Sequence, residues 1–262
     1  MDLSLVIITW NCKDMLERCL DSILKRVGGI SYEIIVIDNN SQDGTTRMLK
    51  ERFLQVHLLV NPENKGVAMA RNQGITIAMG RYILILDADT EIISTNMADL
   101  IEYMDEHREA GLLGCSLFSF SDELLDSART FPHPIHVILR RLKFLGIARE
   151  SEILKRHHIA YRERKKPVVV DFVEGAFQLI RRDVVEKTGL LDEEMFYGNE
   201  DADYCARVTK AGYTVVYFPS FKVRHYHSAI TRRNMFSRMS YYHLMSYVRF
   251  YRKHRDIIKR PI

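Results

Sequence analysis

The chain has 262 residues, of which 47% are hydrophobic and 27% charged, as in an ordinary globular protein. This composition excludes a disordered, collagen-like or disulfide-scaffold chain. A chain of this length can bury enough surface to fold without disulfide or metal crosslinks. We expect neither a membrane-spanning helix nor a signal peptide, because the apolar runs are short and the first residues are not basic. The four cysteines (positions 12, 19, 115 and 205) form no CxxC pair and are expected to be buried, reduced thiols of a cytoplasmic protein.

The net charge of +4 is unevenly distributed along the chain. Residues 140–166 contain ten Lys or Arg against three Glu, and residues 222–262 contain eleven against one Asp. An acidic body with two basic segments favours an anionic partner near them, such as a membrane surface, a phosphorylated substrate or nucleic acid. The alternative for each segment is a solvated helix face without a partner.

The first ninety residues alternate between short apolar runs and helical patterns. We predict strands at Leu3–Thr9, Tyr32–Ile37, Val56–Val60 and Arg81–Leu86. The predicted helices cover Asn11–Lys25, Gly44–Arg52 and Val67–Met79, and Asn11 is the expected N-cap of the first. This alternation indicates βαβ units and a mainly parallel sheet flanked by helices, whose ligands bind beyond the carboxyl ends of the strands.

After about residue 120 the pattern is looser, with a turn-rich segment, a basic amphipathic stretch at 135–145 and a loop at 156–166. Predicted strands follow at Val168–Phe172, Gly175–Arg181, Tyr213–Phe218 and Lys222–His227, with helices starting near Asp183 and over Glu200–Ala211. A last helix, Asn234–Arg255, combines aromatic and methionine side chains with basic ones. That combination suits an anionic membrane surface, and the alternative is packing on the protein body or a dimer partner.

Carboxylates follow two of the predicted strands. Asp87 and Asp89 come directly after Arg81–Leu86, and positions i and i+2 of an extended chain face one way. Two such carboxylates make a hard-oxygen site for Mg²⁺ or Mn²⁺, shared with substrate phosphates. Asp38 follows Tyr32–Ile37, where an acidic side chain can bind a base or a ribose hydroxyl. The alternatives are a solvated turn for the aspartate pair and plain turn chemistry around Asp38.

Seven segments resemble, in order, the family 2 glycosyltransferases of the GT-A fold, and the later ones resemble its rhamnosyltransferase- and galactofuranosyltransferase-like branch. They are Leu3–Asn11, Ile35–Gly44, Asn64–Gly74, Leu84–Asp89, Val173–Arg182, Met195–Arg207 and Val223–Ser228. The resemblance implies a Rossmann-like α/β transferase of nucleotide-diphospho sugars at residues 1–230. It divides that domain into a nucleotide-sugar-binding half (1–118) and an acceptor and catalytic half (119–230), followed by an amphipathic C-terminal helix (231–262).

The same resemblance implies a role for each matched residue. The donor would be bound by Thr9, Asn11, Asp38, Asn64, Gly66, Arg71, Asp87, Ala88, Gly175 and Ala176. The metal would be held by Asp87, Asp89 and His225, with His227 as the alternative to His225. Asp201 matches the catalytic base, with Glu200 beside it, although both carboxylates would also suit simple helix capping. A reaction with a single general base and without a covalent intermediate is expected to invert the anomeric configuration of the sugar. Asp203 and Arg207 are expected to form a pair on the helix surface.

These observations lead to the hypothesis of an inverting, metal-dependent glycosyltransferase of cell-surface polysaccharide biosynthesis. It would use Mn²⁺ or Mg²⁺ and move a sugar, rhamnose in first place, from a dTDP- or UDP-linked donor to a glycan or lipid-linked glycan. We expect it in the cytoplasm, peripheral on the inner face of the cell membrane, with a homodimer as a further option and no nucleic-acid partner. The alternatives are a non-catalytic nucleotide-binding or scaffold subunit and a nucleotidyltransferase, whose glycine-rich phosphate loop is missing at Thr9–Lys13. The basic segment 140–166 matches no motif, and two interpretations remain for it: an acceptor subsite or a surface loop.

Overall fold

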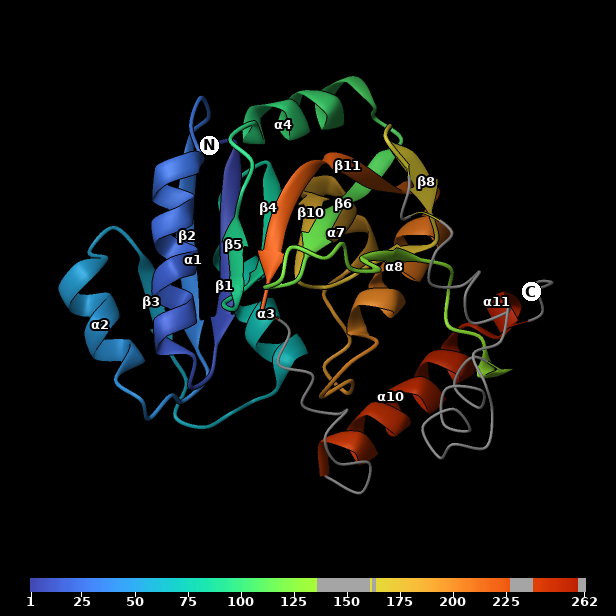
Figure 1. Ribbon diagram of the computed structural model, residues 1–262. Coiled ribbons are helices and arrows are strands. Elements are labelled where there is room, and N and C mark those ends of the chain that lie inside the picture. Colours follow the sequence, from blue (N-terminus) through green and yellow to red (C-terminus); the bar gives the residue numbers. More distant parts are fainter. Residues whose placement is uncertain (136–160, 162–163, 227–237, 259–262) are drawn as a thin grey trace.

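The computed structural model describes residues 1–135, 161, 164–226 and 238–258. Over these residues nine strands form one mixed sheet with helices on both faces, so the predicted α/β class is confirmed (Figure 1). Its order is β3 (His57–Val60), β2 (Tyr32–Asp38), β1 (Leu3–Thr9), β4 (Tyr82–Asp87), β10 (Phe177–Arg181), β6 (Ala110–Phe118), β11 (Thr214–His225) and β5 (Thr90–Ile92), with β8 (Val168–Val170) paired to β11. A small separate sheet joins β7 (Ala128–Arg129) to β9 (Phe172–Val173).

The four strands predicted in the first ninety residues form the parallel half of the sheet. Strand β1 lies between β2 and β4, and β3 pairs with β2. These strands are continuous apolar runs because helices cover both of their faces. In the register, Thr9 lies opposite Asp38 and Ile8 lies opposite Asp87. The carboxyl ends of β2 and β4 therefore place Asp38 and Asp87 on the same edge of the sheet.

The second half of the sheet is largely antiparallel and was harder to predict. Strand β10 runs antiparallel between β4 and β6. Neither β6 nor the helix before it was predicted from the sequence. Strand β11 replaces the two predicted strands at Tyr213–Phe218 and Lys222–His227, with an irregularity between Phe218 and Lys222. The short strand β5 pairs with its end and sets Thr90 opposite His225.

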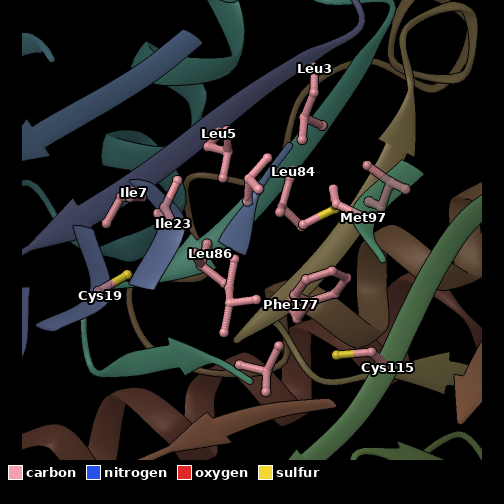
Figure 2. Close-up of a cluster of buried hydrophobic side chains, with 14 of the residues drawn as sticks. Leu3, Leu5, Ile7, Cys19, Ile23, Leu84, Leu86, Met97, Cys115 and Phe177 are labelled. Atoms are coloured by element: carbon pink, nitrogen blue, oxygen red, sulfur yellow. The ribbon is translucent and has the colours of Figure 1, made fainter. Parts of the chain in front are cut away.

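Two apolar clusters fill the space between the sheet and its helices. One face is covered by α1 (Lys13–Arg26), α2 (Thr45–Arg52) and α4 (Met97–Glu106), and Figure 2 shows part of that cluster, from Leu5 and Ile7 to Phe177. The other face is covered by α3 (Val67–Ile77), α7 (Arg182–Thr188) and α8 (Glu200–Lys210). The helices α10 (Arg238–Lys253) and α11 (Arg255–Ile258) join the same cluster through Phe250 and Ile257. The cysteines are free thiols, three of them buried as predicted and Cys12 half-buried.

The start of α1 corrects one prediction. The helix begins at Lys13 after Cys12, so Asn11 is not its N-cap. Asn11 has a φ of 50°, and its side-chain oxygen accepts a hydrogen bond from the backbone N–H of Gln42 at 2.7 Å. The backbone N–H of Lys13 instead donates to the carboxylate of Asp43 at 2.9 Å. The loop after β2 therefore caps α1 from outside, and the two segments are tied together.

Helix α10 packs on the protein body through two acidic residues. Asp192 pairs with Arg249 and Lys253, each at 2.7 Å. Asp203 pairs with Arg207 at 2.9 Å, as predicted, and also with Lys253 at 2.6 Å. The predicted surface location of this pair is wrong, because α10 and α11 leave Asp203 0% exposed. Part of the positive charge of the C-terminal segment is therefore neutralised within the protein.

None of the helices within the described ranges has the length and apolar character needed to cross a bilayer. Several predictions fall on residues that the structure does not describe. They are most of the 135–145 stretch and of the 156–166 loop, His227, and the start of the predicted Asn234–Arg255 helix.

Candidate active site

Three predicted metal ligands converge from two separate parts of the chain. Asp87 ends β4, Asp89 lies in the turn that follows, and His225 ends β11. One ligand atom from each lies within 4.8 Å of the other two. The convergence depends on the β5–β11 pairing, in which the N–H of Tyr226 donates to the carbonyl oxygen of Asp89 at 2.9 Å. Sequence spacing alone could suggest the aspartate pair, but only this pairing brings His225 to it.

The charges around His225 suit a divalent cation. Burial alone would lower the pKa of His225, but its hydrogen bond to Asp89 and the negative charges of Asp89 and Asp87 raise that pKa to about 9. Nε2 of His225 lies 3.4 Å from the carboxylate of Asp89. The site thus attracts positive charge, and a metal ion bound by two carboxylates and an imidazole can take the place of the proton. The donor set fits Mn²⁺ or Mg²⁺.

Arg71 joins the predicted metal ligands to the predicted catalytic carboxylates. It belongs to α3 and is only 2% exposed. Its Nη1 donates to Glu200 at 2.9 Å, and its Nη2 donates to Asp87 at 2.6 Å and to the carbonyl oxygen of Gly175 at 2.9 Å. A buried guanidinium with this set of partners fixes the relative positions of all three groups.

Glu200 and Asp201 begin α8, where the free backbone N–H groups of the first turn favour negative charge. Asp201 is partly exposed, and one of its oxygens accepts a hydrogen bond from the N–H of Gly175 at 3.1 Å. Burial raises the pKa of Asp201. Burial and the neighbouring charge of Asp201 raise the pKa of Glu200 to about 7. Both carboxyl groups are therefore better proton acceptors than an ordinary aspartate or glutamate.

The predicted nucleotide-binding residues lie at the ends of β1 and β2 and in the loop before α3. Asp38 is fully buried, and its oxygens accept hydrogen bonds from the N–H of Ser41 at 2.9 Å and from the hydroxyl of Thr46 at 2.5 Å. The neighbouring Thr9 hydroxyl is buried and finds no hydrogen-bond partner among the described residues. Asp38 therefore holds its own turn, and the buried Thr9 hydroxyl beside it is an unsatisfied polar group of the kind often found at functional sites.

A network of amide side chains shapes the loop before α3. Asn64 accepts hydrogen bonds from the side chain of Asn39 and the N–H of Gly66, both at 2.9 Å. Gly66 has a φ of +86° and faces the ring of Phe196, which leaves no room for a side chain. Asn39 was not singled out in the sequence, and its position directly after Asp38 was the signal that could have identified it.

Two further predicted residues, Ala176 and Ala88, lie next to the metal ligands and contribute through their backbone groups. Ala176 accepts a hydrogen bond from the N–H of Asp87 at 3.3 Å through its carbonyl oxygen. The side chain of Ala88 packs in an apolar cluster and is 5% exposed, so only its backbone can contact a ligand. Glu174 was not predicted, although it directly precedes Gly175, and it pairs with Arg129 of β7. Its negative charge contributes to the raised pKa of Asp201.

A substitution at Gly175 tests whether Arg71 holds Asp87 and Glu200 in place, a role that we call the Arg71 bridge. A methyl group on its Cα would lie 2.8 Å from Nη1 of Arg71. Arg71 is buried and hydrogen-bonded to both Glu200 and Asp87, so it cannot move away from the added methyl group. We therefore expect Gly175→Ala to lower the free energy of unfolding by about 1–3 kcal/mol and to reduce transfer activity. Thermal unfolding and kcat measure the two effects. Gly28→Ala is the control, since no described atom lies within 4 Å of its added carbon. Equal stability and activity of both variants would contradict the bridge.

Solved structures define the class of fold. GalNAc-T7, crystallised with UDP, GalNAc and Mn²⁺, matches 96% of this chain with a TM-score of 0.69 and 18% identity, and the match covers 48% of GalNAc-T7. Staphylococcus aureus TarS 1–349 in complex with UDP matches 98% of this chain with a TM-score of 0.61 and 16% identity, over 72% of TarS 1–349. The predicted GT-A fold is therefore confirmed.

Sequence comparison gives the family. Residues 4–189 match Glycosyl transferase family 2. The N-acetylglucosaminyl-diphospho-decaprenol L-rhamnosyltransferase of Mycobacterium tuberculosis is 25% identical over 99% of this chain and 87% of its own length. The UDP-Glc:alpha-D-GlcNAc-diphosphoundecaprenol beta-1,3-glucosyltransferase WfaP of Escherichia coli is 30% identical over 58% of this chain and 60% of its own. The chain belongs to glycosyltransferase family 2, and its resemblance to the rhamnosyltransferase-like branch is confirmed.

Proposed function

We propose that this glycosyltransferase is inverting and metal-dependent, and that it transfers a sugar to a lipid-linked glycan in cell-surface polysaccharide biosynthesis. Rhamnose from a dTDP-linked donor is the first choice, because the relative that aligns with nearly the whole chain is named as an L-rhamnosyltransferase acting on N-acetylglucosaminyl-diphospho-decaprenol. A UDP-linked donor is the second, because WfaP is named for UDP-Glc. Both names contain an N-acetylglucosaminyl diphosphate on a polyprenol, which is the acceptor class we propose.

The observation that carries the proposal is the cluster of Asp87, Asp89 and His225, which Arg71 connects to Glu200 directly and to Asp201 through Gly175. A divalent cation held by the first three residues would offset the negative charge that builds on the leaving diphosphate. Arg71 adds a fixed positive charge beside it without the need for reorganisation. Such charge stabilisation is needed at the diphosphate end of a nucleotide sugar.

We assign Asp201 as the general base that acts on the acceptor. Its carboxylate takes the proton of the acceptor hydroxyl while the hydroxyl oxygen forms a bond to the anomeric carbon. The bond from that carbon to the diphosphate oxygen breaks, and its electron pair leaves with the nucleoside diphosphate. One displacement from the face opposite the leaving group inverts the anomeric configuration. The N–H of Gly175 and the start of α8 keep Asp201 oriented.

Calorimetric binding of UDP, dTDP, GDP and CDP, each with Mn²⁺ and with EDTA, tests the donor site. We expect one nucleotide to bind selectively and only with the metal. Asp89→Ala should weaken that binding about tenfold or more in Mn²⁺, since a metal ligand is lost, and neither protein should bind the nucleotide in EDTA. Identical affinity of wild type and variant in Mn²⁺ would exclude this metal site. A protein that binds none of the nucleotides would favour a non-catalytic scaffold subunit, or a donor site that forms only with its partner or acceptor.

Contact between α10 and an anionic membrane surface is the second part of the proposal. The outer side of α10 exposes 60% of Tyr241 and 44% of Met245, and Arg252 is exposed further along the helix. Aromatic and methionine side chains next to basic ones favour the boundary between lipid headgroups and acyl chains. A lipid-linked acceptor would be presented at such a surface.

A further inference from the structure

The inner side of α10 lies directly on the turn that precedes the catalytic carboxylates. Gly198 in this turn has a φ of +79°, and a methyl group there would lie 2.6 Å from the ring of His243. The hydroxyl of Ser246 donates to the carbonyl oxygen of Tyr197 at 3.2 Å. Because Glu200 follows this turn within two residues, the middle of α10 forms part of the wall around the start of α8.

Aromatic rings continue from this turn along α10. The ring centroids of Tyr197 and His243 are 6.1 Å apart, those of His243 and Tyr247 are 4.9 Å apart, and those of Tyr247 and Tyr251 are 6.1 Å apart. All four residues are half-buried. Burial raises the pKa of Tyr197, and the charges of Glu200, Asp87 and Asp89 raise it further, which places the Tyr197 ring within their field. We call Tyr197, His243 and Tyr247 the aromatic row.

The loop before α3, which carries the proposed nucleotide residues Asn64 and Gly66, is covered by Phe196 rather than by the aromatic row. The turn at Gly66 is covered by the ring of Phe196, which in turn contacts Tyr242 of α10 with centroids 4.7 Å apart. Phe196 therefore lies between Gly66 and Tyr242 of α10. A nucleotide bound along β1, β2 and the metal ligands would leave the row to the second substrate, whose hydroxyl must reach Asp201.

We propose that the aromatic row is the acceptor subsite and binds a pyranose ring of the acceptor by stacking. This inference rests on the proposed function. A pyranose has an apolar face of C–H groups and a polar rim of hydroxyls. Tyr and His match that pattern, since each has an apolar ring face and a polar tip. A polyprenyl chain has no polar rim of this kind, and the exposed Tyr241 and Met245 on the outer side of α10 suit it better.

Steady-state kinetics with a short-chain alkyl ester of N-acetylglucosaminyl diphosphate as the acceptor test the subsite. We expect Tyr247→Leu, which keeps apolar volume but has no ring, to raise the KM for this acceptor about tenfold. Tyr247→Phe should keep a KM near that of the wild type, because the ring remains. Tyr241→Leu is the matched control on the outer side of the same helix. The affinity for the nucleotide should be unchanged in all three.

An unchanged acceptor KM in Tyr247→Leu, or an equal rise in Tyr241→Leu, would overturn the subsite. A rise that occurs only with a long-chain ester would also overturn it, since the ring would then contact the lipid. His243→Leu is the second variant, with the same expected rise, and replaces Tyr247→Leu if that protein does not fold. Failure of the proposed function is distinguishable, because the wild type would then neither bind the nucleotide nor hydrolyse the donor.

Discussion

Replacement of Asp201 by Asn should reduce the rate of sugar transfer by about three orders of magnitude, which lies within the range for a positioned general base. The side chain keeps its shape, and its remaining carbonyl oxygen can still accept the hydrogen bond from Gly175, which is 3.1 Å in the wild type. What is lost is the capacity to take up the acceptor's proton. Because the hydrogen bonds of Asp201 come from the N–H groups of Gly175 and Ala202, which both stay in place, the affinity for the nucleotide should remain within about twofold of the wild type.

Glu200→Gln is the matched control for this prediction. Glu200 is the neighbouring carboxylate, is 6% exposed and pairs with Arg71 through one oxygen, so its amide can keep that contact. We expect a smaller loss of kcat in Glu200→Gln than in Asp201→Asn, together with a changed affinity for the donor. Single-turnover transfer and calorimetry measure the two quantities. If Asp201→Asn retained transfer and Glu200→Gln abolished it, Glu200 would be the base, and its raised pKa of about 7 would then be the relevant one.

The parallel half of the sheet could be predicted because each strand carries its own signal. The runs at Leu3–Thr9 and Tyr82–Asp87 are continuous and apolar, and polar residues follow directly at the strand ends. Parallel pairing then brings those ends to one edge without further information. The strand pattern alone therefore predicts that Asp38 and Asp87 lie at the same edge, and that Asp87 and Asp89 form a carboxylate pair.

The rest of the site depends on contacts between residues far apart in the sequence. His225 reaches Asp89 only because β5 pairs with β11, and β5 is three residues long and carries no strand pattern of its own. Strand β10 enters antiparallel between β4 and β6, and β6 itself was not predicted. The burial of Asp203 depends on α10, which is separated from it by more than thirty residues of sequence. Local patterns carry no information on such pairings.

Replacement of Asp203 by Asn should lower the free energy of unfolding by about 3 kcal/mol at neutral pH, which is typical for removal of one partner from a buried ion pair. Asp203 is fully buried and accepts from Arg207, Lys253 and Nε2 of His254, at 2.9, 2.6 and 2.9 Å. Lys210 donates to the other nitrogen of His254 at 3.0 Å. The neutral amide cannot balance the positive charges of Arg207 and Lys253, so α10 and α11 should separate from α8 more easily. Urea unfolding, followed by circular dichroism, measures the difference.

The difference between wild type and Asp203→Asn should depend on pH in a defined direction. Burial by itself would raise the pKa of Asp203, but hydrogen bonds from His254 and Lys253 and the charge of Arg207 hold it well below the ordinary value. In the unfolded chain an aspartate titrates near pH 4. The stabilisation is therefore complete above that pH and is lost as the pH falls towards the pKa in the folded state. We expect a difference of about 3 kcal/mol at pH 7 that becomes smaller below about pH 4.

Asp256→Asn provides the control, because Asp256 pairs with Lys210 at 2.8 Å on the same helices but is 58% exposed. A solvent-exposed pair contributes little to stability, so this variant should unfold close to the wild type at both pH values. A difference for Asp203→Asn that matched the Asp256 variant, or that did not change with pH, would show that the buried cluster does not hold α10. The aromatic row would then lack a fixed support, because α10 carries two of its three rings and α8 begins with the two carboxylates.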